Sequence, residues 1–319
     1  MAKTAVYTVM GGLGRQLMQA QIALELTEKY DRVLVFAHYV NELSVFFSGH
    51  EKITLLTYDQ LGAMSATIMV NPDDYDIFRY NIYDDGEFSK KMASFYNVAR
   101  KLVGLKEKKE DNNKDGQATM PVFLMNTMDN INNAAEFSKQ HPKFVMFCRQ
   151  GGLSNLPGPD GRRQPGQEHG LLRSYPIDKS EKLIELLNQK GYEVLQVCLP
   201  EEPHIKGAIY MNNEMPMTFY TELAKYAEAV ITIDSSLMHF TIANCKKMVA
   251  IWLQTNVNGF GYVKAINLNP VNYTPIALLM SGIMDSPVCT PASPEDIVNA
   301  LDSWPERTHW AIQEISRRI

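Results

Sequence analysis

Short apolar, β-rich runs alternate with segments of helical period along this chain, and this alternation limits it to a few folds. The runs TAVYTVM (residues 4–10) and RVLVFAHYV (residues 32–40) flank a glycine turn and a segment with one apolar helical face. Because a crossover from strand through helix to strand requires parallel strands, the opening predicts a parallel sheet covered by helices. The apolar face consists of Leu13, Leu17, Ala20 and Leu24.

The same alternation continues toward the C-terminus. ITLLTY and ATIMV are interpreted as further strands, and a second series begins at KFVMFCRQ. Asp178 is a candidate N-cap of the next helix, and Gly191 a candidate stop signal. YEVLQVCL, VITID and MVAIWL follow as strands, with helices predicted for FYTELAKYAEA and SSLMHFTIAN. Ser293 then caps a helix over SPEDIVNALDSW.

A chain of 319 residues exceeds what one core usually holds. We expect an α/β fold with a Rossmann-like domain over residues 1–140, a second over residues 141–305, and a terminal helix over residues 306–319. The charged segment 106–117 has nothing to bury and is interpreted as an exposed loop.

Composition describes an ordinary globular protein, with 45% hydrophobic and 21% charged residues. No leader pattern and no run of about 18 apolar residues is present. Cys148, Cys198, Cys245 and Cys289 form no CxxC pair, so we expect reduced structural thiols and a cytoplasmic protein. A net charge of -5 gives no overall attraction to nucleic acid or an anionic membrane.

Polar residues concentrate in the turn that follows strand VITID. Ligands of open α/β sheets lie beyond the carboxyl ends of the strands, where Asp234 ends the strand and Ser235 and Ser236 begin a helix. The first N–H groups of a helix favour an anion such as phosphate, and His239 falls close by. The alternative is a plain capping role for Asp234 or Ser235, with a hydrogen-bonded core histidine.

The pattern DSSxxH between two apolar strands, followed by TNVNGFGYVKAINLNP, resembles the donor-binding region of heptosyltransferase-like glycosyltransferases. That family carries D-S-G-x-x-H at the diphosphate of the nucleotide sugar, and Ser236 replaces the glycine here. The resemblance covers roughly residues 144–301 and gives Arg173 the position of a phosphate-neutralising cation, with Thr255 also on the donor side. It implies the GT-B fold, in which two Rossmann-like domains face one another across a cleft.

A further candidate cation, Arg149, follows strand FVMFC and precedes Gly151 and Gly152. Glycines let backbone amides approach a ligand, and a guanidinium suits phosphate, although a surface arginine in a plain loop is the alternative. The long polar loop that follows contains Arg162 and Arg163, which are interpreted as a solvated pair more readily than as contacts to an anionic acceptor.

The first glycine turn, GGLGRQ, does not match a dinucleotide fingerprint, because Leu17 occupies the position of its last glycine. A nicotinamide enzyme is therefore disfavoured. GGLGRQLMQ resembles the GGLGNQ openings of fucosyltransferases and the turn that faces the cleft in heptosyltransferases, so the turn is a candidate acceptor-side element. Its residues are Gly11, Gly12, Gly14 and Arg15.

The base that would deprotonate an acceptor hydroxyl is not evident. In heptosyltransferases an aspartate of the first turn is the proposed base, but Arg15 stands here and cannot accept a proton at neutral pH. His38, at the end of the second strand, is the first candidate, and Asp84 and Asp85 are the second. Each also fits an ordinary exposed or capping role.

A literal D-x-D occurs at Asp74 and Asp76, and two carboxylates could hold a divalent cation with a diphosphate. The surrounding NPDDYD is a turn-forming cluster, which already accounts for these aspartates. We therefore expect no metal site and no cofactor, with helix N-termini and basic side chains stabilising the leaving diphosphate.

Taken with the resemblance, these patterns predict a metal-independent glycosyltransferase that moves a sugar from a nucleotide sugar to an acceptor hydroxyl. A saccharide or lipid-linked glycan is the expected acceptor. Two alternatives stay open: a transferase acting on a hydroxymethylated pyrimidine in DNA, whose base would need to be flipped or single-stranded, and a non-catalytic sugar-nucleotide-binding protein.

Overall fold

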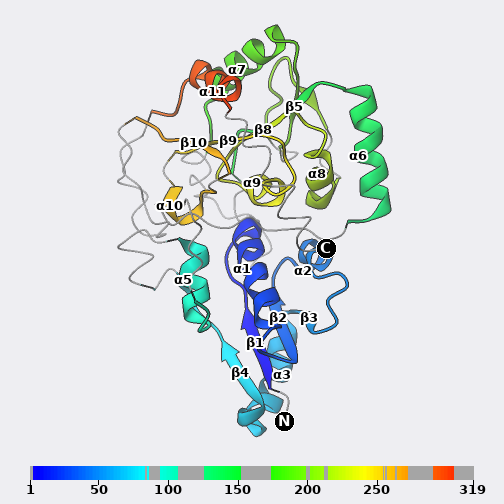
Figure 1. The fold of residues 1–319 in the computed structure, drawn as a ribbon, viewed down its shortest axis with the longest axis vertical. Coiled ribbons are helices and arrows are strands. Elements are labelled where there is room, and N and C mark those ends of the chain that lie inside the picture. Colours follow the sequence, from blue (N-terminus) through cyan, green and yellow to red (C-terminus); the bar gives the residue numbers. More distant parts are fainter. Residues whose placement is uncertain are drawn as a thin grey trace. The chain divides into compact units, whose positions relative to one another are not determined.

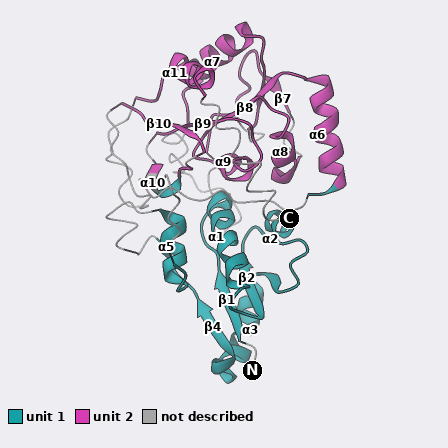
Figure 2. Cartoon of the chain, in the orientation of Figure 1, with its two compact units in different colours: residues 1–127, 258–260 teal, residues 128–257, 261–319 magenta. Residues whose placement is uncertain are grey.

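The computed structural model divides the chain into two compact units, coloured separately in Figure 2. Unit 1 comprises Met1–Thr127 and Asn258–Phe260, and unit 2 comprises Met128–Val257 and Gly261–Ile319. The structure describes residues 3–82, 85, 94–106, 126–151, 174–198, 202–211, 215–253, 255, 257–262, 264–271 and 290–304. Helix α6 (Met128–Gln140), which the sequence places in the first half, groups with unit 2. The expected terminal helix lies outside the described residues.

Unit 1 contains a four-stranded sheet in the order β3-β2-β1-β4, and every pairing is parallel (Figure 1). Strands β2 and β3 lie on one side of β1 and β4 lies on the other, so the chain reverses direction across the sheet between β1 and β4. Its elements are β1 (Thr4–Thr8), α1 (Leu13–Leu26), β2 (Arg32–Ala37), α2 (Val40–Phe46), β3 (Ile53–Thr57), α3 (Tyr58–Val70), η1 (Pro72–Asp74), β4 (Tyr75–Phe78) and α5 (Phe95–Leu102).

The predicted strand ATIMV is wrong, because these residues end helix α3. Thr57 and Gln60 form a capping box at the end of β3, so the helix begins directly after the strand. Leu61, Met64 and Ile68 recur at helical spacing and pack on a cluster of Val6, Leu34 and Phe36. Short apolar runs fit either element, and the cap decided this one.

Two glutamines of α1 are buried against the turns at the carboxyl edge of the unit 1 sheet. Gln16 donates from Nε2 to the Gly11 carbonyl at 2.8 Å, and its Oε1 accepts from the amide of His38 at 3.1 Å. Gln19 donates to the Met10 carbonyl at 2.7 Å and accepts from the Met10 amide at 3.2 Å. These amides therefore hold the turns after β1 and β2 in fixed positions relative to α1.

Unit 2 contains a six-stranded, wholly parallel sheet in the order β10-β9-β8-β5-β6-β7. The alternating strands and helices predicted for this half are confirmed, and both units are α/β. Besides α6, its elements are β5 (Phe144–Cys148), α7 (Ile177–Gln189), β6 (Glu193–Gln196), β7 (Ile209–Tyr210), α8 (Met217–Leu223), β8 (Ala229–Ile233), α9 (Ser236–Thr241), β9 (Met248–Ile251), β10 (Ile266–Leu268) and α11 (Pro294–Asp302); α10 (Val257–Phe260) straddles the unit boundary.

Helix ends in unit 2 follow the local signals with one exception. Gly191 adopts φ +77 just beyond α7, as expected of a C-terminal glycine. Ser293 and Asp296 form the capping box of α11, with Pro294 at its first position. Asp178, however, lies inside the first turn of α7, and Pro176 is the N-cap, so the predicted cap lies two residues too late in the sequence. None of the described helices has both the length and the hydropathy required to span a membrane.

Replacing Gln16 by Ala should destabilise unit 1, because the Gly11 carbonyl and the His38 amide would lose their buried partner. Each orphaned buried polar group costs about 1–3 kcal/mol. Urea unfolding followed by circular dichroism measures this loss. Gln140→Ala is the control, since that side chain is exposed and bonds only Glu136 among the described contacts. Equal stabilities of the two variants would contradict the role given to Gln16.

Candidate active site

The carboxyl ends of β5 and β8 form the centre of the candidate site in unit 2. These strands are neighbours, with Cys148 paired to Thr232 in register, although β6 and β7 intervene between them in sequence. A reversal of strand order of this kind is where open α/β sheets bind ligands. Burial raises the pKa of the Cys148 thiol to about 11. Hydrogen bonds with the hydroxyls of Ser235 and Thr232 act in the opposite direction and lower this pKa. The thiol is therefore a neutral packing group that joins the two strand ends.

Helix α9 begins at Ser236, with Ser235 as an extended N-cap residue, as the sequence predicts. The Ser235 hydroxyl does not cap the helix: it lies 2.9 Å from the hydroxyl of Thr232. The N–H groups in the first turn of a helix have no intrahelical acceptor. Here the Met238 amide donates to the Ser235 carbonyl at 3.1 Å, and the Ser235 side chain caps none of these N–H groups.

His239 is buried and lies between two polar side chains (2% exposed). Its Nδ1 is 2.6 Å from the hydroxyl of Tyr262, and its Nε2 is 3.7 Å from a carboxylate oxygen of Asp234. Burial and the negative charge of Asp234 raise the pKa of Tyr262 far above its ordinary value, so this phenol stays protonated. Both predicted residues of the turn, Asp234 and His239, are thus brought together, and Tyr262 joins them.

Arg149 is not a surface residue: it is 6% exposed and largely committed to the protein. One terminal nitrogen donates to the Tyr175 carbonyl at 3.0 Å and the other to Oε1 of Gln150 at 3.1 Å. Its Nε is buried and has no hydrogen-bond partner among the described residues. The guanidinium is therefore held rigidly at the end of β5, and its Nε–H donor is the one without a partner among the described residues.

One group at this edge, the carboxylate of Glu202, was not predicted from the sequence. Glu202 is 7% exposed and follows β6, the strand next to β5. Burial, followed by the charge of Glu202, raises the pKa of Cys198 to about 12. Cys148 also raises the pKa of Cys198 and Arg149 lowers it, so these groups lie close to one another. The position of Glu202 after a strand of the second series was the available signal, but the acidic pair in LPEEP reads as an ordinary loop.

The other candidates for the donor side are either buried in the structure or lie outside the described residues. Gly151 and Thr255 are buried.

Tyr262 and Trp252 are fully buried, so neither ring can stack on a nucleotide base. Cys148, Cys198 and Cys245 are free and buried, as predicted for structural thiols. The candidates and alternatives that lie outside the described residues are Gly152, Arg162, Arg163, Arg173, Asp84 and Cys289.

In unit 1 the first glycine turn is fixed by backbone geometry. Gly11 has φ +92, which favours glycine, and Gly12 is the N-cap of α1. Gly14 is buried within the helix. Arg15 lies with its guanidinium carbon 4.6 Å from the ring centre of Phe260, a residue of the same unit. The arginine that replaces the family's aspartate therefore makes a cation–π contact.

His38 is exposed at the end of β2 and is oriented from two sides. Its amide bonds Gln16, and its ring stacks on that of Tyr58, with centres 4.2 Å apart and planes at 33°. Tyr58 in turn donates its hydroxyl to the Val9 carbonyl after β1. Asp85 is half-buried, and its amide bonds the Ile82 carbonyl. His38 thus combines exposure with a fixed orientation.

The D-x-D sequence lies at the opposite edge of the unit 1 sheet. Tyr75 pairs with Thr4, the first residue of β1, so Asp76 is at the amino end of the parallel strands. Asp76 pairs with Lys3 at 2.6 Å and accepts the Tyr30 hydroxyl at 2.7 Å, and these contacts lower its pKa. These two contacts account for the position of the Asp76 carboxylate without a metal ion. Among the described residues, no three His, Cys, Asp or Glu side chains gather as a metal site would require.

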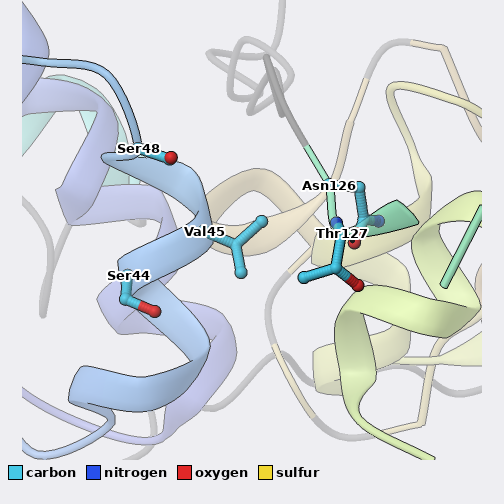
Figure 3. Close-up of a pocket in the computed structure, with 5 residues that line it drawn as sticks. All are labelled: Ser44, Val45, Ser48, Asn126 and Thr127. Carbon is cyan, nitrogen blue, oxygen red and sulfur yellow. Dashed lines mark hydrogen bonds between the residues drawn. The ribbon is translucent and has the colours of Figure 1, made fainter. Parts of the chain in front are cut away.

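A pocket of about 340 Å³ in unit 1 contains none of the predicted site residues. Figure 3 shows Val45 directed from α2 toward Thr127. The other lining residues are Ser44, Ser48 and Asn126. Because the lining includes no ionisable side chain, we assign the chemistry to the strand ends rather than to this pocket.

The family model described as glycosyltransferase family 9 (heptosyltransferase) matches residues 165–273, which include α9 and its turn. The resemblance predicted from the sequence is confirmed. With the fold, the match identifies the chain as a nucleotide-sugar-dependent glycosyltransferase of GT-B type. No curated protein matches the whole sequence significantly.

Two solved structures support the GT-B fold. A family 9 glycosyl transferase from Veillonella parvula has a TM-score of 0.62 at 13% identity, covering 94% of this chain and 96% of its own. ADP-heptose lipopolysaccharide heptosyltransferase II from E. coli has a TM-score of 0.54 at 13% identity, covering 98% and 99%. At such identities the similarity concerns the fold alone.

Replacing Gly261, which precedes Tyr262, by Ala should destabilise the protein. A Cβ there would lie 2.6 Å from the Val257 carbonyl oxygen, which is a backbone atom that cannot move aside. Overpacking of this kind costs about 1–3 kcal/mol. Urea unfolding would measure it. In the control, Gly62→Ala, no atom lies within 4 Å of the new Cβ and a helical position gains about 0.5–1 kcal/mol, so the two variants should shift in opposite directions.

Proposed function

We propose that unit 2 binds the diphosphate of a nucleotide sugar at the carboxyl ends of β5 and β8. The observation that carries this proposal is the reversal of strand order between these strands, which places Arg149 beside the turn holding Asp234 and Ser235. The family match spans that turn, and the E. coli heptosyltransferase that shares this fold is named for ADP-heptose. Arg173 and Thr255 remain proposed donor contacts on the strength of the resemblance.

The chemistry available here suits a leaving diphosphate. The first turn of α9, which the Ser235 side chain does not cap, offers backbone N–H groups, and the Arg149 guanidinium adds a positive charge held in place at the same edge. Asp234 offers only acceptors, which suits a hydroxyl of the sugar or ribose rather than a phosphate oxygen. We therefore propose transfer without a metal ion, with charge on the diphosphate stabilised by the protein's own donors.

For the acceptor we propose the carboxyl edge of unit 1, with His38 as the base. Its ring is exposed, its backbone is fixed by Gln16, and its stacking on Tyr58 leaves an edge free to meet a hydroxyl. An imidazole ring nitrogen carries a lone pair that can accept a proton. Asp84 and Asp85 are the second candidates. A saccharide or lipid-linked glycan is the acceptor class proposed, with a hydroxymethylated DNA base as the other acceptor to test.

His239→Gln should weaken nucleotide binding by about tenfold, or about 1.4 kcal/mol, because Asp234 would lose the imidazole that faces its carboxylate beside the proposed diphosphate site. Isothermal titration with UDP, GDP and ADP, first on the wild type and then on the variant, measures this. His141→Gln is the matched control: His141 pairs with Glu193 at 3.2 Å, at the amino end of β6. No binding of any nucleotide by the wild type would refute the donor site. Titrations with added EDTA should give unchanged affinities.

His38→Ala should abolish most transfer while leaving nucleotide affinity unchanged, since general-base catalysis contributes about 10²–10⁴-fold. The measurement is transfer from the nucleotide sugar that binds, across a panel of saccharide, lipid-linked and hydroxymethylated DNA acceptors. His50→Ala is the control, because His50 precedes β3 at the amino edge of the same sheet. Full activity of the His38 variant would remove this residue and leave the base to the second candidates.

A further inference from the structure

The loop that follows β9 makes an unusual set of contacts with α9. Lys264 donates from Nζ to the carbonyls of Ile242 at 2.9 Å and Cys245 at 2.8 Å, just beyond the end of that helix. Tyr262, two residues earlier, reaches His239 within the helix. One short stretch of chain therefore holds α9 at two points along its length.

The position of Tyr262 is itself well supported. Its carbonyl accepts from Nδ2 of Asn267 at 3.2 Å, and Oδ1 of Asn267 accepts from the indole of Trp252 at 2.8 Å. The residue before it, Gly261, has no room for a side chain against Val257. The hydroxyl is thus presented to His239 by backbone that cannot easily shift.

The surroundings of His239 decide which ring nitrogen carries the proton. Tyr262 is buried and protonated, so its O–H is a donor that requires an acceptor, and among the described contacts that acceptor is Nδ1. In the reverse tautomer the lone pair of Nε2 would face the Asp234 carboxylate at 3.7 Å, which is repulsive. With the proton on Nε2, the ring instead presents an N–H to that carboxylate.

We propose that Tyr262 is a positioning residue of the donor site, which holds His239 in the Nε2–H tautomer so that the ring orients the Asp234 carboxylate. The role of Tyr262 in nucleotide binding rests on the proposed function, whereas the tautomer of His239 does not depend on it. Asp234 immediately precedes the N-cap of α9, where the diphosphate is proposed to bind. An N–H group that faces this carboxylate partly offsets its negative charge, which reduces its repulsion of an incoming anion.

The tautomer can be measured directly in the full chain without any variant. Long-range ¹H–¹⁵N spectra of histidine-labelled protein distinguish a protonated from an unprotonated ring nitrogen, and loss of one signal set in His239→Gln assigns the residue among the seven histidines. We expect an unprotonated Nδ1 and a protonated Nε2 in the wild type near neutral pH. A protonated Nδ1 would overturn the proposal.

Tyr262→Phe then tests the cause. The variant should lose the fixed tautomer, with His239 signals moving toward a mixture, and should bind the preferred nucleoside diphosphate about tenfold more weakly in isothermal titration. Tyr210→Phe is the control, because Tyr210 stacks on His204 in another loop and should leave the His239 signals unchanged. An unchanged tautomer or an unchanged affinity in Tyr262→Phe overturns the proposal.

The two hypotheses fail in different ways. If the wild type binds no nucleotide, the proposed function fails, and the role of Tyr262 in the donor site fails with it even when the Nε2–H tautomer is observed. If the wild type binds a nucleotide but Tyr262→Phe binds it equally well, only the role of Tyr262 is lost.

Discussion

The pairing of β5 with β8 is the contact on which the candidate donor site depends. These strands are far apart in sequence, yet their parallel register sets Cys148 beside Thr232 and so brings Arg149 and Ser235 to the same edge. Buried apolar residues on both strands, including Val145 and Ile231, belong to one core cluster with α7 and α11. The hydrophobic energy of that core thus determines the geometry of polar groups that contribute little to it.

Much of the fold could be predicted because its signals are local. The two series of strands and helices, the caps at Gly191 and Ser293, and the turn at Asp234 and Ser235 each follow from short stretches of sequence. ATIMV was assigned wrongly because a run of four apolar residues and a threonine suits a strand or a helix equally, and the capping box that decides between them lies nine residues earlier, at Thr57.

The finer parts of the site could not be predicted because they depend on contacts distant in sequence. Nothing near Tyr262 indicates that its hydroxyl meets a histidine twenty-three positions earlier. Gln16 and Gln19 lie outside the apolar face predicted for this helix, yet they are buried and bonded to backbone groups of two turns. Arg149 was expected to be free for phosphate or exposed to solvent, and it is instead buried with two of its nitrogens engaged.

The junction between β3 and α3 has no connecting residue, since Thr57 ends the strand and Tyr58 begins the helix. An insertion there would carry the ring of Tyr58 away from His38 and from the Val9 carbonyl. After β5 the situation is reversed, because Gln150 pairs with Ser174 and closes the long intervening segment at its base. A change in the number of residues between Gln150 and Ser174 would therefore leave the two bridged positions side by side, whereas one residue added between Thr57 and Tyr58 would disturb the contacts that orient His38.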